Sequence, residues 1–126
     1  MKVPLLDLKK QYAGVRDETK RMLEDILESQ YFIGGPYVAK FEEAVAEYSG
    51  TKFAVGVSSG TDALLASLMA LGIYRSPLDE GAPDEVVVPA YTFFATAGCV
   101  WRAGARPVFA DIDADTYNID PKSFEA

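Results

Sequence analysis

The chain has 126 residues, of which 49% are apolar and 25% are charged, as in a single soluble globular domain that can bury a core. Its net charge of −7 argues against nucleic acid and anionic membranes as partners, but it leaves room for a phosphate ligand, which binds to local hydrogen-bond donors. Histidine is absent and Cys99 is the one cysteine, so the sequence predicts neither an internal disulfide nor a metal site. We expect Cys99 to be a small core residue in a helix.

Met1–Asp7 has no apolar core of the length that a signal peptide requires, so no signal peptide is expected here. The longest apolar stretch, around residues 63–73, is too short and too interrupted to span a bilayer. We therefore expect a cytoplasmic protein with no membrane partner.

Residues 1–52 are predicted to form a helical segment. The first helix is expected from about Lys9 to Ser29, with its apolar residues on one face. The second begins at Pro36 and runs to about Tyr48, with Gly50 just beyond its end. Its inward residues are predicted to be Val38, Phe41, Val45 and Tyr48. Between the helices, the apolar loop 31–36 is either a hydrophobic plug or a binding loop.

Residues 53–126 show the alternation of an α/β domain. Strands are predicted near 53–57, 85–88 and 107–110, separated by helices that end near Gly72 and Gly104, with a polar surface loop at 76–83. This order is typical of a parallel sheet flanked by helices, with any ligand at the carboxyl ends of the strands. A further helix start at Asp120-Pro121 is followed by only five residues, which predicts a chain truncated from a longer protein.

The turn Ser58–Asp62 follows the first predicted strand and starts a helix, where free backbone N–H groups and the helix dipole attract anions. Gly60 would let a ligand approach the backbone closely. Three interpretations stay open at this point: a capped turn that binds nothing, a phosphate site, or a hydrolase. Gly56–Gly60 fits the G-x-S-x-G pattern of a nucleophile elbow, but no histidine is present to activate Ser58.

Several segments in order resemble the DegT/StrS-type sugar aminotransferases, which are pyridoxal-phosphate enzymes of the aspartate-aminotransferase fold (fold type I). The resemblance covers essentially the whole chain. It rests on the segments 32–36, 41–42, 58–64, 89–93, 104–108, 111–113 and 117–121. One departure is the turn at 82–86, which follows a longer loop than is common in the family. The resemblance implies that residues 53–126 begin the large, parallel-rich cofactor-binding domain.

The resemblance also implies a cofactor site. Gly60, Thr61 and Asp62 would hold the phosphate of pyridoxal phosphate, Asp62 through its amide while its carboxylate caps the helix or turns away. Phe93 would stack on the cofactor ring, with Tyr91 and Phe94 as alternatives; from the residues alone, Phe93 is interpreted as a core residue. The loop 32–36 resembles one that reaches the partner subunit's active site in a homodimer.

The implied activity is transfer of an amino group to a keto-sugar, nucleotide-linked, with glutamate or glutamine as the donor. In the family the Schiff-base lysine, the aspartate on the pyridine nitrogen and a further phosphate-binding serine lie beyond position 126. The resemblance therefore predicts no catalytic residue in this chain. Two alternatives remain: a sugar dehydratase of the same fold in which that lysine is replaced, and a non-catalytic remnant or regulatory protein.

Overall fold

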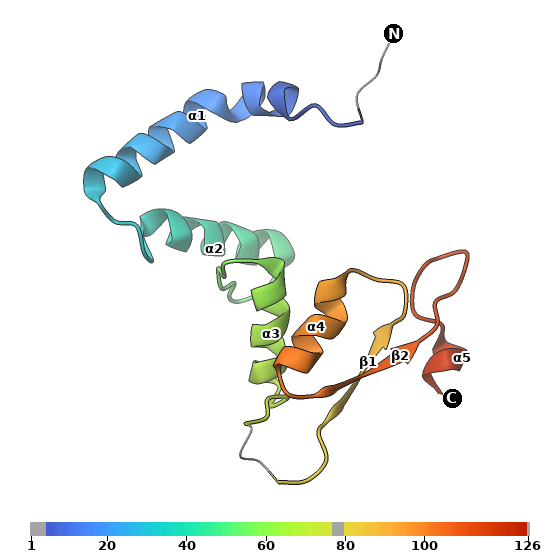
Figure 1. Ribbon diagram of the computed structural model, residues 1–126. Coiled ribbons are helices and arrows are strands. Elements are labelled where there is room, and N and C mark those ends of the chain that lie inside the picture. Colours follow the sequence, from blue (N-terminus) through green and yellow to red (C-terminus); the bar gives the residue numbers. More distant parts are fainter. Residues whose placement is uncertain (1–4, 77–79, 126) are drawn as a thin grey trace. The chain divides into compact units, whose positions relative to one another are not determined.

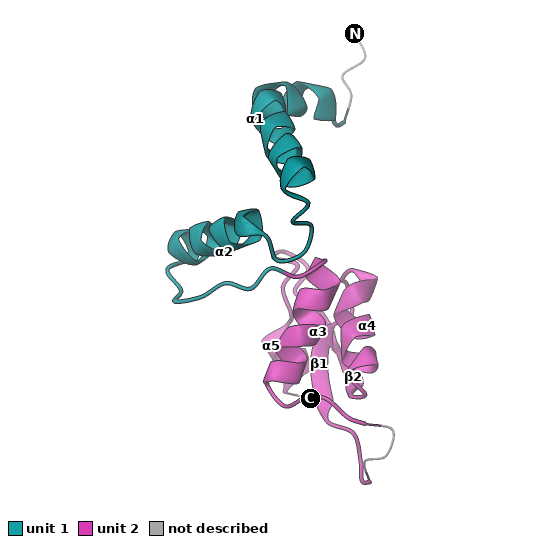
Figure 2. Cartoon of the chain, turned by 90° about the vertical axis from the view of Figure 1, so that its left-hand side faces the viewer, with its two compact units in different colours: residues 1–56 teal, residues 57–126 magenta. Residues whose placement is uncertain are grey.

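The computed structural model describes residues 5–76 and 80–125, and contacts divide the chain into two units, Met1–Gly56 and Val57–Ala126 (Figures 1 and 2). This division follows Gly56, whereas the predicted domain boundary between residues 52 and 53 stays a prediction. Unit 1 contains α1 (Leu8–Ser29) and α2 (Pro36–Ser49). Unit 2 contains α3 (Gly60–Ala70), β1 (Glu85–Pro89), α4 (Phe94–Arg102), β2 (Arg106–Ala110) and α5 (Pro121–Phe124).

Both predicted helices of unit 1 are confirmed, and their ends are fixed by capping residues. Asp7 caps α1 by accepting a hydrogen bond from the Lys10 N–H at 3.0 Å. In α2, Pro36 occupies the first turn, where its missing N–H costs nothing. Gly50 ends α2 with a φ of +66°, a left-handed conformation that glycine adopts without strain.

The predicted inward face of α2 is wrong. Val38, Phe41 and Tyr48 are exposed, Val45 is half-buried, and Ala46 is the buried residue of this helix. The loop between the helices forms no plug either, since Ile33 is 91% exposed. The helical periodicity correctly placed these residues on one face, but a face is buried only where another element covers it. In the described part of unit 1 this face is covered too little to be buried.

Unit 2 is built on a parallel pair of strands covered by α3 and α4, which lie side by side (Figure 1). The strands pair in register, with Val87 opposite Val108, as predicted for parallel strands at these positions. Val88, Val100 and Ala105 form the buried centre between the sheet and α4. Cys99 is only 1% exposed, which confirms it as a small core residue.

The predicted strand at 53–57 is wrong, because the described part of the chain contains a sheet of β1 and β2 alone. A strand requires a neighbour that accepts and donates its backbone hydrogen bonds. Here the N–H of Gly56 donates instead to the Glu42 carboxylate at 2.7 Å. A β-branched and aromatic pattern favours a strand, but it does not supply a pairing partner. Of the predicted surface loop at 76–83, residues 77–79 lie outside the described residues.

The segment after β2 is closed by side-chain hydrogen bonds. Ile112 and Ile119 form an antiparallel bridge around a turn in which the Asp113 carboxylate accepts from the N–H and hydroxyl of Thr116 and from the N–H of Asp115. These bonds, that from the Thr116 N–H foremost, lower the pKa of Asp113 below its ordinary value. Asp120 then caps α5, as its sequence signal predicted.

Two glycines of unit 2 give opposite predictions for replacement by alanine. Gly104 has a φ of +80°, and a Cβ there would lie 2.9 Å from the Arg75 carbonyl oxygen, so Gly104→Ala should lower the free energy of unfolding by about 2 kcal/mol or more. Gly98 lies inside α4 and its Cβ would meet only the exposed Phe94 ring, so Gly98→Ala should be neutral or raise that energy by about 0.5–1 kcal/mol. Urea unfolding measures both, and equal effects would contradict this account of the turn after α4.

Candidate functional site

The Ser58–Asp62 turn is held by a reciprocal network at the start of α3. Ser59 is the N-cap residue, and its Oγ accepts a hydrogen bond from the Asp62 N–H at 3.1 Å. In return, the hydroxyls of Ser59 and Ser58 both donate to Asp62 Oδ2, the former at 2.8 Å. The Ala63 N–H donates to the Ser59 carbonyl at 3.0 Å. The turn therefore combines a serine N-cap with an aspartate side chain that accepts from two serine hydroxyls.

These bonds determine the charge of Asp62. The Ser58 hydroxyl, then that of Ser59, and more weakly the Arg102 guanidinium lower the pKa of the Asp62 carboxyl below its ordinary value. A carboxylate with a lowered pKa is a weak general base, so Asp62 does not activate Ser58 as a nucleophile. The hydrolase interpretation therefore has neither a histidine nor a competent base at this turn.

Two backbone donors at the turn remain open. The N–H groups of Gly60 and Thr61 have no hydrogen-bond acceptor among the described residues, whereas the N–H of Asp62 is engaged by Ser59. Gly60 is exposed, and a Cβ built on it would meet nothing within 4 Å, so the space beside this residue is open. Free N–H groups at the positive end of a helix dipole, next to the Thr61 hydroxyl, suit the oxygens of an anion.

Helix α4 also contacts this turn. The buried Cys99 thiol donates to the Thr61 carbonyl oxygen at 3.2 Å. Arg102, at the end of α4, brings its Nη1 to 3.9 Å from Asp62 Oδ1. The sequence did not suggest either contact, because about 40 residues separate the partners and nothing local marks them as neighbours.

The aromatic residues that follow β1 are on the surface. Phe93 is the N-cap residue of α4 and is 78% exposed, so its interpretation as a core residue is wrong. Tyr91 and Phe94 are exposed as well, and the Tyr91 ring lies 6.0 Å from that of Tyr117. No hydrogen bond or ion pair joins Phe93 to the Ser58–Asp62 turn in the described part of the chain. Which of these rings would meet a cofactor remains a prediction.

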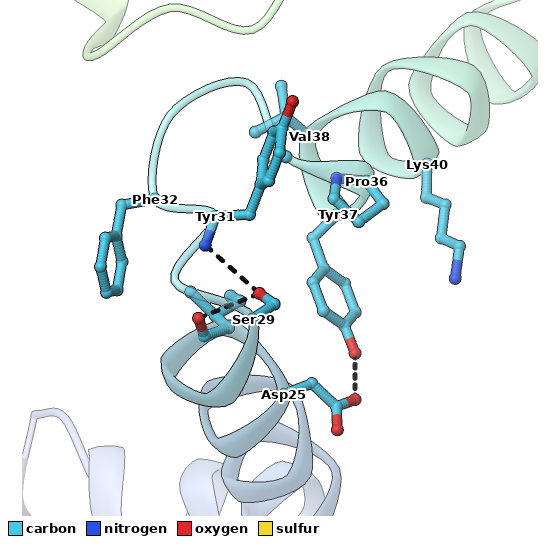
Figure 3. Close-up of a pocket in the computed structure, with 10 residues that line it drawn as sticks. Asp25, Ser29, Tyr31, Phe32, Pro36, Tyr37, Val38 and Lys40 are labelled. Carbon is cyan, nitrogen blue, oxygen red and sulfur yellow. Dashed lines mark hydrogen bonds between the residues drawn. The ribbon is translucent and has the colours of Figure 1, made fainter.

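Unit 1 has a separate hollow of about 300 Å³ between the end of α1, the loop 31–35 and the start of α2 (Figure 3). In it the Tyr37 hydroxyl donates to Asp25 Oδ2 at 2.6 Å, and this bond raises the pKa of Tyr37. Lys40 Nζ lies 5.5 Å from the centre of the Tyr37 ring. Figure 3 shows the Phe32 ring pointing away from this cluster. The sequence analysis did not identify Asp25, Tyr37 or Lys40, because they are ordinary helix-surface residues by pattern.

The described residues contain no group of three or more histidine, cysteine or acidic side chains that could hold a metal ion. Within residues 5–76 and 80–125, no helix is long and apolar enough to cross a membrane.

Known proteins align with nearly the whole chain. The model of the DegT/DnrJ/EryC1/StrS aminotransferase family matches residues 14–126. A pleiotropic regulatory protein of Geobacillus stearothermophilus is 47% identical over 126 residues, all of this chain and 32% of that protein. The UDP-2-acetamido-2-deoxy-3-oxo-D-glucuronate aminotransferase of Pseudomonas aeruginosa is 39% identical over 98% of this chain and 33% of its own length. This chain thus spans about a third of the length of these relatives.

Solved structures agree with the family match. A DegT DnrJ EryC1 StrS aminotransferase from Brucella abortus superposes with a TM-score of 0.87 at 36% identity, over 99% of this chain and 32% of that one. The GDP-4-keto-6-deoxy-D-mannose-3-dehydratase of E. coli, with bound hydrated pyridoxal phosphate, gives a TM-score of 0.70 at 36% identity, over 84% of this chain and 27% of that one. These matches confirm the predicted α/β fold.

The two serines of the turn should differ in their effect on stability. Ser59→Ala removes the side chain that caps the Asp62 N–H, and should lower the free energy of unfolding by about 1 kcal/mol. Ser58→Ala is the matched control: it removes a hydroxyl that donates only to the Asp62 carboxylate, so its cost should be below about 0.5 kcal/mol. Urea unfolding of the two variants compares them, and a Ser58→Ala cost equal to that of Ser59→Ala would contradict the assigned cap.

Proposed function

The chain belongs to the DegT/DnrJ/EryC1/StrS aminotransferase family, and we propose that the complete protein is a pyridoxal-phosphate-dependent aminotransferase that acts on a keto-sugar. The sugar is nucleotide-linked, and the amino donor is glutamate or glutamine. The observation that carries the proposal is the pair of open N–H donors of Gly60 and Thr61 at the start of α3. The relative from Pseudomonas aeruginosa, named as an aminotransferase of a UDP-linked oxo-sugar derivative, supports the substrate class.

The donors at the turn fit the phosphate of this cofactor. A phosphate monoester presents several anionic oxygens, and the N–H groups of Gly60 and Thr61, with the Thr61 hydroxyl, would donate to them. Asp62 would hold the turn in place and would not bind the phosphate, since its N–H already donates to the Ser59 hydroxyl oxygen. The exposed Phe93 ring would stack on the cofactor ring. Bound pyridoxal phosphate would supply an electron sink for the carbon that exchanges its amino group.

The complete protein is further proposed to be a cytoplasmic homodimer. The support is the exposed apolar loop that contains Phe32 and Ile33, which a partner subunit would cover. In this arrangement the loop of one subunit reaches the other's active site, as the family resemblance implies. Residues 1–52 would form the helical segment and residues 53–126 the start of the cofactor-binding domain.

Two other functions have a specific observation in their favour. The structural likeness to a sugar dehydratase with bound pyridoxal phosphate supports dehydration in place of amino transfer. The 47% identity to a protein named as a regulator supports a regulatory role. The products formed from a keto-sugar and glutamate separate them: an amino-sugar indicates transamination, a deoxy-sugar indicates dehydration, and no turnover with cofactor bound indicates regulation.

Replacement of Gly60 tests the phosphate site. In the complete protein, Gly60→Val would add methyl groups at the helix end that carries the open N–H donors and so crowd the approach of a phosphate. The affinity for pyridoxal phosphate should fall roughly tenfold, or about 1.4 kcal/mol. The fold should survive, because the space around this position is open. Absorbance titration of the apo-protein measures affinity, and circular dichroism measures folding. Gly14→Val, also in open space but on α1, is the control, and unchanged affinity in Gly60→Val would place the phosphate elsewhere.

The 126-residue chain by itself should not catalyse amino transfer. Covalent capture of the cofactor requires a deprotonated lysine aimed at its aldehyde, and the six lysines in the described residues are all exposed on the surface. The test incubates the purified chain with pyridoxal phosphate, reduces it with borohydride and locates any modified lysine by mass spectrometry. Stoichiometric labelling of one lysine, together with amino transfer to a keto-sugar, would overturn this prediction.

A further inference from the structure

Asp62 poses an electrostatic problem for the proposed phosphate site. Its carboxylate belongs to the same helical turn as the open N–H groups of Gly60 and Thr61, and it is ionised well below neutral pH. A second negative charge this close opposes the binding of a phosphate dianion. The groups that face the carboxylate are the hydroxyls of Ser58 and Ser59 on Oδ2 and the guanidinium of Arg102 near Oδ1.

Arg102 is the cation among these groups. Its Nη1 lies 3.9 Å from Asp62 Oδ1, and it occupies the last turn of α4, where the helix dipole favours a positive charge. Three residues earlier on the same helix, Cys99 is buried and its thiol donates to the Thr61 carbonyl at 3.2 Å. Residues three apart lie on one face of a helix, so this face of α4 contacts Thr61 and Asp62 together. The buried Cys99 contact thereby keeps Arg102 beside the turn.

The ion pair of Arg102 and Asp62 is too exposed for its main effect to be on the stability of the fold. The side chains of Arg102 and Asp62 are 51% and 39% exposed, and ion pairs of this kind add little to stability. A charge beside a ligand site can nevertheless change the affinity for an ionic ligand without changing the fold.

We propose that Arg102 is a positioning residue of the phosphate site: it offsets the charge of Asp62 and fixes its carboxylate, so that a phosphate monoester can bind the N–H groups of Gly60 and Thr61. The ligand class is the phosphate of the cofactor, so this inference rests on the proposed function. Arg102 acts through Asp62 and makes no contact with the reacting atoms.

The first experiment measures binding of pyridoxal phosphate, and separately of inorganic phosphate, to the complete apo-protein. Arg102→Gln should weaken both by a factor of roughly 2 to 5 at low salt, with a smaller effect at high salt. Arg102→Lys should retain most of the affinity, because it keeps the charge. Arg106→Gln is the matched control. It removes the same charge, but the native Arg106 pairs with Glu85 at the start of the strands and not with Asp62. Unchanged affinity in Arg102→Gln, or an equal loss in Arg106→Gln, would overturn the proposal.

A double-variant cycle with Asp62→Asn tests whether Arg102 acts through Asp62. If it does, Arg102→Gln has little effect once Asp62 is neutral. An equal loss in both backgrounds would mean that Arg102 acts directly on the ligand, which overturns the positioning role. Carboxyl NMR gives a readout free of ligand: loss of the nearby cation should raise the pKa of Asp62 in Arg102→Gln, while Arg106→Gln leaves it unchanged.

These measurements also separate this inference from the proposed function. Binding of pyridoxal phosphate with no dependence on Arg102 leaves the function in place and refutes the inference. Binding of inorganic phosphate that depends on Arg102, without binding of pyridoxal phosphate, refutes the function and supports the inference. An apo-protein that binds neither ligand refutes both.

Discussion

The backbone N–H groups in the first turn of a helix have no acceptor within that helix, and the candidate site depends on this constraint. In the first turn of α3, only some of these N–H groups find an acceptor elsewhere. Ser59 accepts the N–H of Asp62 through its side chain and that of Ala63 through its carbonyl, which leaves the N–H groups of Gly60 and Thr61 open. The cap therefore stabilises the helix and at the same time selects which donors remain for a ligand. An uncapped turn would have more donors but a less defined position for them.

Net charge is a poor guide to such a site. The chain carries −7 overall and places Asp62 next to the open donors, yet the hydroxyls of Ser58 and Ser59 donate to that carboxylate and Arg102 lies beside it. Hydrogen bonds delivered to a carboxylate stabilise its charge and keep it in one orientation. What an approaching anion meets is the local arrangement of N–H groups and charges within a few ångströms, because more distant surface charges are screened by salt.

The sequence predicted the elements whose signals are local. Gly50 and Asp120 mark helix ends through signals within a few residues, and both act at those ends in the structure. The apolar runs of β1 and β2 were read correctly for the same reason. The strand at 53–57 failed because pairing depends on a neighbour that local sequence does not specify. The contacts of Cys99 and Arg102 with the turn were missed because they join segments about 40 residues apart.

The residues that carry the family resemblance and the residues that form the core are largely different. Val88, Cys99 and Val100 are buried, and they lie outside the segments on which the resemblance rests. Phe32, Ile33, Tyr91 and Phe93 lie within those segments and are exposed. Large exposed apolar side chains are common at surfaces that bind a ligand or another polypeptide, so this exposure agrees with the roles proposed above for Phe32 and Phe93. The same reasoning explains why Phe93 was misplaced: composition alone assigns a phenylalanine to the core, and only the structure shows it at the exposed start of α4.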